Sequence, residues 1–246
     1  MDHTPQTSLI VGADGGIGAA YLNACLATPA AANASTNYVL TSRRPVSACQ
    51  PDLNWLQLDF SVSSTLDQLQ EQLTRYLKQI DRLIIASGLL HHAGLKPEKG
   101  LSQLKSHAIQ HLFTANAAGP LAVLAALEPL LKDAESPKIA ILSAQVGSIE
   151  DNHMGGWYSY RMSKAALNMG IKTAAIEMAR WKNDPVVVAV HPGTTHSSLS
   201  KPFVVRRKAP VQSAASAGIR LQQLIEQLTP EDNGKFLTLD HQILPW

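Results

Sequence analysis

Tyr160 and Lys164 stand four residues apart in the segment 157–164, which is rich in aromatic and polar side chains. If this segment is helical, the spacing places both side chains on one face about one turn apart, so an ammonium group lies beside a phenol. A free phenol has a pKa of about 10, and a neighbouring positive charge lowers it by favouring the phenolate. The pair therefore predicts a general acid or base at Tyr160. Five tyrosines in one chain also produce this spacing by chance, so the elements around the pair must decide.

Short apolar runs alternate with longer amphipathic segments along the chain. Seven runs are too short for helices and several are rich in Ile and Val, so they predict buried strands at 8–11, 38–41, 55–58, 83–86, 139–142, 186–190 and 236–239. Between them, apolar residues at helical spacing predict helices at 17–27, 63–80, 101–113, 121–131, 160–181 and 211–228. This alternation predicts an α/β fold, a doubly wound parallel sheet of about seven strands with helices on both faces.

Length and composition are consistent with one soluble domain spanning 1–246. The chain has 246 residues, of which 45% are hydrophobic and 16% charged, enough for a substantial core. A net charge of +2 argues against nucleic acid or a membrane surface as a partner. Cys25 and Cys49 lack metal-ligand spacing and are expected to be free thiols in a reducing compartment. With no export signal or transmembrane run in the sequence, we expect a cytoplasmic protein.

A glycine-rich turn follows the first predicted strand and opens the first predicted helix. Gly12, Gly16 and Gly18 give the spacing G-x-x-x-G-x-G. Glycines allow positive φ and close backbone approach, and a helix N-terminus presents free N–H groups to a pyrophosphate. The turn predicts a dinucleotide site; the alternative is a tight strand-to-helix connection with no ligand.

The end of the second predicted strand indicates which dinucleotide binds. The strand runs into Arg43 and Arg44, and no acidic residue stands there to accept from a ribose 2′-hydroxyl. Guanidinium groups suit a 2′-phosphate, so NADP(H) is preferred, with NAD(H) as the alternative. The arginines would otherwise be solvated loop residues. Asp59, after the third strand, is suited to accept from the adenine amino group or to cap the helix that follows.

These motifs, taken in order, resemble the short-chain dehydrogenase/reductase family over nearly the whole chain. Beside the glycine turn and Asp59, the resemblance rests on Asn116 within Asn-Ala-Ala-Gly, on Tyr160 and Lys164, and on Pro192-Gly193 after the sixth strand. The segments 147–149, 155–161 and 191–195 further resemble the branch that contains the C-factor and sniffer-like carbonyl reductases. The resemblance implies a Rossmann-type fold and an NAD(P)-dependent oxidoreductase.

The family likeness assigns residues to the site. It implies the catalytic residues Asn116, Ser143, Tyr160 and Lys164. It implies cofactor binding by Gly12, Gly16, Ile17, Gly18, Arg43, Arg44, Asp59, Phe60, Ser87, Gly88, Asn116, Tyr160, Lys164, Pro192, Gly193 and Thr195. Thr195 has the alternative of a turn or helix cap.

The roles implied are those of hydride transfer between nicotinamide and a small carbonyl or alcohol substrate. Tyr160 donates the proton to the carbonyl oxygen, and Ser143 hydrogen-bonds that oxygen as charge develops. Lys164 lowers the pKa of Tyr160 and contacts the nicotinamide ribose. Asn116 holds a water that links Lys164 to solvent.

Three parts of the sequence depart from the family pattern. Val11 replaces a threonine, and Ile85-Ala86-Ser87-Gly88 replaces Asn-Asn-Ala-Gly. Counted back from Gly147, the catalytic serine position falls on Ala144, with Ser143 one residue earlier. Successive residues of a strand face opposite sides, so Ser143 reaches the site only if the strand end bulges or turns. Ser143 is the preferred candidate and Ser148 the weaker one.

Other functions remain open alternatives. One is a nucleotide-binding signalling or regulatory protein of the C-factor type with little turnover, and another is an epimerase or dehydratase that uses the same cofactor. His91, His92, His191 and His196 lack the spacing of a metal site, and the basic run 206–208 is interpreted as a solvated face. The loops 89–100, 148–157 and 194–208 are expected to form a partly apolar substrate pocket. The family habit implies a homodimer or homotetramer.

Overall fold

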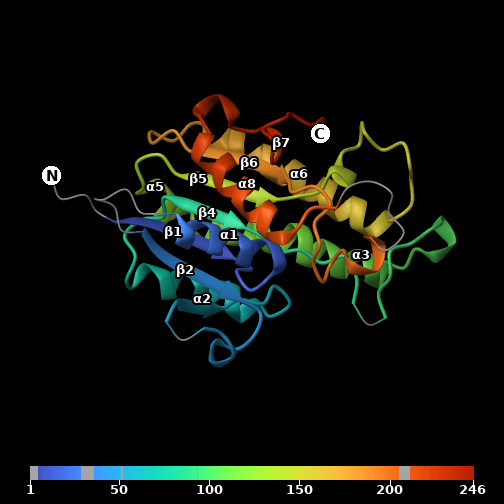
Figure 1. Ribbon diagram of the computed structural model, residues 1–246, viewed down its shortest axis with the longest axis horizontal. Helices are drawn as coiled ribbons and strands as arrows, with labels where there is room; N and C mark the ends of the chain where they lie inside the picture. Colours follow the sequence, from blue (N-terminus) through green and yellow to red (C-terminus); the bar gives the residue numbers. More distant parts are fainter. Residues whose placement is uncertain (1–4, 29–35, 51, 93, 205–210) are drawn as a thin grey trace.

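The computed structural model describes residues 5–28, 36–50, 52–92, 94–204 and 211–246. Within them, a seven-stranded sheet runs through the middle of the molecule in the order β3-β2-β1-β4-β5-β6-β7 (Figure 1). All six neighbouring pairs are parallel. The strands are β1 Gln6–Val11, β2 Thr36–Ser42, β3 Asn54–Gln57, β4 Arg82–Ile85, β5 Lys138–Leu142, β6 Val186–His191 and β7 Phe236–Thr238. The predicted doubly wound sheet is confirmed.

Helices cover both faces of this sheet. Alternate residues of β1 show the two faces, since Leu9 and Val11 belong to one core cluster and Ile10 to the other. The first cluster is completed by α2 Ser63–Thr74, α4 Gly119–Ala126, α5 Glu128–Lys132 and α6 Tyr158–Met178. The second is completed by α1 Gly16–Ala27 and α8 Ala214–Gln227. Burial on both faces explains why the strands are continuous apolar runs.

Two predicted helices are divided in the structure. The segment 121–131 becomes α4 and α5, separated at Leu127, because Pro129 lacks an N–H and its ring would clash with the carbonyl four residues earlier. The segment 101–113 becomes a 3₁₀ turn, η2 Leu101–Gln103, followed by α3 Ser106–Phe113. Helix α2 ends at Thr74 instead of continuing to residue 80.

A π-helical turn, η3 Thr114–Ala118, joins α3 to α4. Its central residue, Asn116, is fully buried. Single π turns within α-helices are frequent at functional sites, because the wider turn redirects one side chain.

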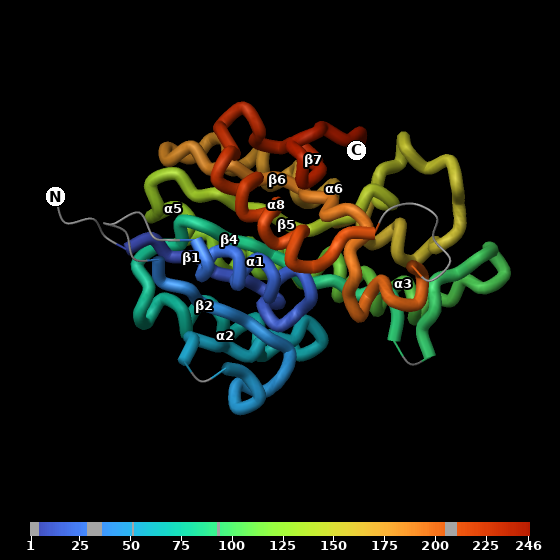
Figure 2. Tube along the Cα trace, viewed as in Figure 1, coloured from blue at the N-terminus to red at the C-terminus, as the bar shows by residue number. Residues whose placement is uncertain are grey.

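The loops that follow the strands gather at one end of the molecule. Figure 2 shows the segments 88–92, 94–105, 145–158 and 191–204 together at the end away from the N-terminus. The last of these includes a short helix, α7 Lys201–Val204. Because all strands are parallel, their carboxyl ends open toward these loops, where doubly wound folds bind ligands. None of the helices in the described segments combines the length and apolar composition that a bilayer crossing requires.

Candidate active site

A cavity of about 560 Å³ lies at the carboxyl ends of the strands. It is lined by most of the residues predicted from the sequence: Gly12, Gly16, Ile17, Arg43, Asp59, Phe60, Ser87, Gly88, Ser143, Tyr160, Lys164, Pro192, Gly193 and Thr195. Three predicted residues, Gly18, Arg44 and Asn116, are not part of its wall. The fold therefore brings both ends of the predicted site into one continuous space.

The glycine turn forms one end of this cavity. Gly12 has φ +77°, in the left-handed region that favours glycine. A Cβ on Gly18 would overlap the carbonyl oxygen of Gly12, so Gly18 permits the close packing of the turn instead of facing the cavity. The first N–H groups of α1 have no intrahelical partner and carry a partial positive charge, so this end suits a phosphate.

The two arginines after β2 differ in their surroundings. Arg43 lines the cavity, whereas Arg44 donates from Nε to the carboxylate of Asp14 at 2.9 Å. The backbone N–H of Arg44 also donates to the Ser42 hydroxyl at 2.9 Å, which fixes the turn. Arg43 is therefore the arginine available to an anion in the cavity.

Asp59 also lines the cavity, and its carboxylate is held by Ser61. Oδ1 accepts from the Ser61 backbone N–H at 2.9 Å and from its hydroxyl at 2.7 Å. Burial raises the pKa of Asp59, but the Ser61 hydrogen bonds and the charge of Arg43 outweigh it, so the pKa lies below its ordinary value. Asp59 is thus an ionised acceptor at the cavity wall, placed by a turn that precedes α2.

Ser87 provides a test of whether a polar ligand fits here. Its Oγ is buried and has no hydrogen-bond partner among the described residues, although Ser87 lines the cavity. Buried hydroxyls without partners are rare in proteins and call for a ligand or a water. The glycine turn, Arg43 and Ser87 together fit a phosphorylated, hydroxyl-rich cofactor.

Tyr160 lies at the other end of the cavity, at the start of α6. Its side chain is 7% exposed and packs with Leu90, Leu95, Ala108 and Leu112. Burial raises the pKa of Tyr160 above its ordinary value. The net shift is therefore opposite to the one expected from Lys164, because desolvation penalises the phenolate in this apolar cluster. The phenol is held in its protonated form.

Lys164 is buried one turn further along α6. Its Nζ donates to the carbonyl oxygen of Leu142, the last residue of β5, at 3.0 Å. Burial lowers the pKa of Lys164 to about 8. The ammonium is thus held at the cavity wall by the end of β5, and its charge titrates near pH 8.

Asn116 ties two walls of the site together. Its Oδ1 accepts from the backbone N–H of Leu89 at 2.7 Å, and its Nδ2 donates to Leu89 O at 2.8 Å and to Ser163 Oγ at 3.0 Å. Leu89 follows β4, and Ser163 precedes Lys164 on α6. The amide of Asn116 therefore positions the helix that carries Tyr160 and Lys164.

Ser143 and Ala144 point in different directions at the end of β5. The hydroxyl of Ser143 donates to Oδ1 of Asn168 on α6 at 2.5 Å. Ala144 packs against the apolar cluster that contains Tyr160. Both residues line the cavity, but the one that packs against this cluster has only a methyl side chain. Ser148, the weaker candidate, bonds Trp246 O at 3.1 Å and is absent from the wall of this cavity.

The start of α6 depends on a residue that the sequence analysis did not single out. Trp157, the N-cap, has φ 53° and no side-chain cap, so the first turn is capped from elsewhere. The buried carboxylate of Glu98 accepts the hydroxyl and, at 3.3 Å, the N–H of Ser159. The Glu98 carbonyl accepts the Trp157 N–H at 2.6 Å. Glu98 and Ser159 are 61 positions apart, and no local pattern links them.

Apolar and aromatic side chains complete the wall near Tyr160. Trp157 lies edge-on to Tyr160 and to Phe203, with ring centroids 6.2 Å and 5.1 Å apart. Leu89, Leu90, Val146, Leu199 and His111 also line the cavity. The three loops predicted to form a partly apolar pocket all contribute, although the loop 148–157 does so only through Trp157.

Three further expectations concerned the cysteines, a metal site and the basic run 206–208. Cys25 and Cys49 are free thiols, as predicted. No group of three or more potential metal ligands exists among the described residues. The basic run 206–208 lies outside the described residues.

The sequence matches the family described as short chain dehydrogenase over residues 6–207. It is 35% identical over 158 residues to the 1-hydroxy-2-glutathionyl-2-methyl-3-butene dehydrogenase of Rhodococcus sp. (strain AD45), covering 64% of this chain and 67% of that protein. It is 33% identical over 134 residues to the C-signal protein of Myxococcus xanthus, covering 54% of this chain and 76% of that protein.

Solved structures agree with the fold. The carbonyl reductase Sniffer of D. melanogaster superposes with a TM-score of 0.83 at 22% identity, covering 99% of this chain and all of that chain. An NADPH-bound carbonyl reductase from chicken fatty liver gives a TM-score of 0.83 at 22% identity, covering all of this chain and 96% of that chain. The predicted branch is thus represented among the relatives and the structures. The chain belongs to the short chain dehydrogenase family, whose members are NAD(P)-dependent oxidoreductases.

Proposed function

We propose that this protein is an NADP(H)-dependent oxidoreductase that interconverts a small carbonyl compound and its alcohol, with Tyr160 as the general acid or base. One observation carries the proposal. A single cavity of about 560 Å³ contains the buried phenol of Tyr160 and the ammonium of Lys164 and also reaches the glycine turn and Arg43. One ligand can therefore be anchored at the turn while its far end lies beside the proton donor.

The residues fit the cofactor from end to end. When bound, the nicotinamide supplies or accepts the hydride. Gly12 and the first turn of α1 would hold the pyrophosphate, Asp59 the adenine amino group and Ser87 a polar group of the ligand. Arg43 would pair with a 2′-phosphate, which favours NADP(H) over NAD(H). The NADPH-bound carbonyl reductase of similar fold supports this choice.

Tyr160 is suited to donate in the reducing direction. Its buried phenol is protonated, and the proton passes to the carbonyl oxygen as that oxygen gains negative charge. The charge of Lys164 then stabilises the phenolate that remains. Asn116 keeps α6 in register with the loop after β4, so both groups stay at the cavity.

Ser143 would donate a second hydrogen bond to the substrate oxygen. This requires a change at Asn168, whose Nδ2 is buried without a partner among the described residues while its Oδ1 takes the Ser143 hydrogen. Turning the amide by 180° would let Nδ2 donate to Ser143 Oγ, because the two amide atoms have nearly the same shape. The Ser143 hydrogen would then be released for the substrate.

The substrate would be small and partly apolar. The wall beside Tyr160 is formed by Trp157, Phe203, Leu90 and Leu199, with His111 as a polar neighbour. We also expect self-association through α6, which exposes Met162, Met169 and Ile176 at intervals of seven residues.

The direct test is NADPH oxidation with a panel of aldehydes, ketones and quinones, with NADH in parallel. The proposal expects turnover with at least one apolar carbonyl compound and a preference for NADPH. Tight NADPH binding without turnover on any of them would contradict the enzymatic role.

That second outcome would favour a nucleotide-binding regulatory protein. Two observations support this alternative: the hydroxyl of Ser143 donates its hydrogen to Asn168, and one relative is a C-signal protein. Buried Tyr160 and Lys164 in the same cavity favour the enzyme. An epimerase or dehydratase would convert substrate without net NADPH consumption, which product analysis detects.

A further inference from the structure

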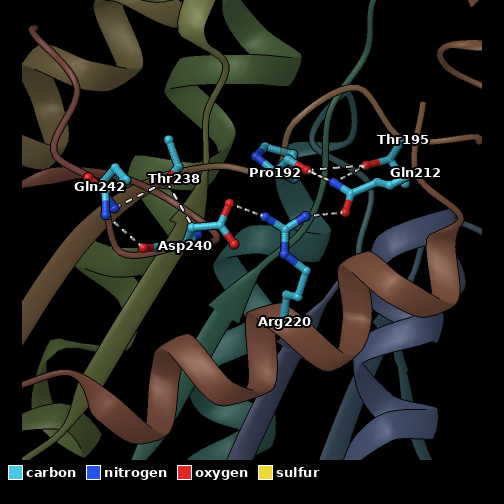
Figure 3. Close-up of polar contacts among 7 residues, drawn as sticks. All are labelled: Pro192, Thr195, Gln212, Arg220, Thr238, Asp240 and Gln242. Atoms are coloured by element: carbon cyan, nitrogen blue, oxygen red, sulfur yellow. Dashed lines mark hydrogen bonds and ion pairs between the residues drawn. The ribbon is translucent and has the colours of Figure 1, made fainter. Parts of the chain in front are cut away.

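Every polar group of Gln212, which lies in the segment before α8, takes part in a hydrogen bond. Its backbone N–H donates to Thr194 O at 3.0 Å, and its carbonyl accepts from the His196 N–H at 2.9 Å. Its side-chain Nε2 donates to the carbonyl of Pro192 and to Thr195 Oγ1, the latter at 3.2 Å. Figure 3 shows this amide pointing into the turn 192–195. One side chain therefore bridges both ends of that turn.

Arg220 on α8 determines which way the amide faces. Its Nη1 donates to Gln212 Oε1 at 2.6 Å (Figure 3). A guanidinium has only donors, so it accepts no amide hydrogen and must face the oxygen of Gln212. The NH₂ group is thereby directed to Pro192 and Thr195. Orientation of the amide is thus set by a charge on another element.

Asp240 holds Arg220 from the other side. Its Oδ2 lies 2.5 Å from Arg220 Nη2, and its backbone N–H donates to the Thr238 hydroxyl at the end of β7, at 3.3 Å. Asp240 is 67% exposed and Arg220 33% exposed, so solvent screens this pair. Of Gln212, Arg220 and Asp240, we expect Asp240 to contribute least to holding the turn 192–195.

The turn held by Gln212 forms the wall of the cavity after β6. Gly193 has φ +70°, and a Cβ there would lie 3.0 Å from Gln212 Nε2. Thr195 is 4% exposed, and its own hydrogen has only long contacts, 3.3 Å to Pro192 O and 3.4 Å to Gly193 O. Because Thr195 Oγ1 accepts from Gln212, its hydrogen is left to donate to a ligand.

We propose that Gln212 is a positioning residue for the nicotinamide half of the cofactor: it fixes the 192–195 turn and makes Thr195 a donor, with Arg220 setting the orientation of the amide. This inference rests on the proposed function, since it assigns the nicotinamide to that turn. It predicts an effect confined to one half of the cofactor, because the residues proposed for the adenine half, Arg43 and Asp59, lie in the loops after β2 and β3.

The test compares two ligands by titration, without turnover. NADPH occupies both halves of the site, whereas adenosine 2′,5′-bisphosphate occupies only the adenine half. Gln212→Met removes the donor and Gln212→Glu keeps the acceptor for Arg220 but cannot donate. Both variants are expected to weaken NADPH about tenfold, the value of one to two hydrogen bonds, and to leave the bisphosphate within about twofold. Gln223→Met, at an exposed position on the same helix, is the matched control.

Arg220 and Asp240 give a graded second series. Arg220→Met should weaken NADPH less than Gln212→Met, and Arg220→Lys should recover part of the loss. Asp240→Asn should have the smallest effect, and its effect should fade with added salt because the pair is exposed. If Asp240→Asn weakened NADPH binding more than Arg220→Met, or Arg220→Met more than Gln212→Met, the proposal that Arg220 acts through Gln212 would be contradicted.

Failure of this inference differs from failure of the proposed function. If the wild type binds neither ligand, the dinucleotide site itself is wrong. If the wild type binds both and Gln212→Glu binds NADPH as tightly as the wild type, the positioning role is wrong. Equal losses for both ligands would mean that Gln212 supports the fold in general, which also overturns the inference.

Discussion

The hydroxyl of Ser143 donates to Oδ1 of Asn168, so the serine predicted for the active site is attached to the helix that carries Tyr160. Ala144, the next residue, packs against the apolar cluster that contains Tyr160. Because successive residues at the end of a strand face opposite sides, the one-residue offset places the methyl group of Ala144, and not the hydroxyl of Ser143, against that cluster. Whether Ser143 contributes depends on the Asn168 amide.

Replacing Ser143 tests this contribution. Ser143→Ala should lower kcat for carbonyl reduction about 10²-fold, the loss typical of one hydrogen-bond donor to a developing oxyanion. Steady-state kinetics with one good carbonyl substrate measures it, and NADPH titration controls for the cofactor site. An unchanged kcat would exclude Ser143, and a gain of activity in Ala144→Ser would then identify position 144 as the one facing the substrate.

Removal of the Glu98 carboxylate should destabilise the start of α6. Glu98→Ala leaves the buried N–H and hydroxyl of Ser159 without an acceptor, which costs about 1–3 kcal/mol in the free energy of unfolding. Glu98→Gln keeps an acceptor oxygen and should lose less. Urea denaturation measures both, with the exposed Glu150→Ala as control. Equal stability of Glu98→Ala and the control would refute the capping role.

The pH dependence of reduction should follow Lys164. Its pKa is lowered to about 8 by burial, so its charge is lost as pH rises through that value. Because the charge stabilises the phenolate of Tyr160 after proton donation, kcat/KM should fall above about pH 8. In Lys164→Arg, which keeps its charge, the fall should be absent up to about pH 10. A wild-type profile that stays flat through pH 9 would contradict this assignment.

Stability offers an independent measurement of the same group. The folded-state pKa of Lys164 lies below its ordinary value of 10.5, so between about pH 8 and 10.5 the unfolded chain binds more protons than the folded one. The free energy of unfolding should therefore rise with pH across this window, relative to Lys164→Met, on the order of 1 kcal/mol per pH unit. If the free energies of unfolding of the wild type and Lys164→Met change with pH in parallel, the pKa of Lys164 is not lowered in the folded protein.

Cofactor choice should depend on Arg43. Arg43→Ala should weaken NADPH about tenfold or more and NADH less than about twofold, since only NADPH carries the 2′-phosphate. Binding is measured by quenching of protein fluorescence, and Arg75→Ala, at an exposed ion pair at the end of α2, is the control. Equal losses for NADPH and NADH would place Arg43 away from the 2′-phosphate.

Much of the fold followed from local pattern. The seven strands were predictable because parallel strands buried on both faces are continuous apolar runs, and the glycine turn was predictable from its place between β1 and α1. Parallel pairing then brings the strand ends together, so Arg43, Ser87 and Tyr160 line one cavity although they are far apart in sequence. The apolar pattern and the parallel topology are therefore enough to predict the sheet and the location of the cavity.

The remainder depends on contacts that no local pattern encodes. Glu98 reaches Ser159 across 61 positions, and Gln212 reaches Pro192 across 20, so neither partner is visible in the sequence. The pKa of Tyr160 was predicted from spacing alone, whereas burial in the cluster of Leu90 and Leu112 determines it. The side-chain direction of Ser143 depends on a single residue of register.

Tyr160→Phe tests the central claim most directly, because it removes only the phenolic oxygen. The account predicts that kcat for NADPH-dependent carbonyl reduction falls about 10²–10⁴-fold, while the Kd for NADPH changes less than about twofold. Tyr158→Phe, two residues earlier on the same helix, should retain activity. Turnover by Tyr160→Phe at the wild-type rate would show that Tyr160 is not the proton donor.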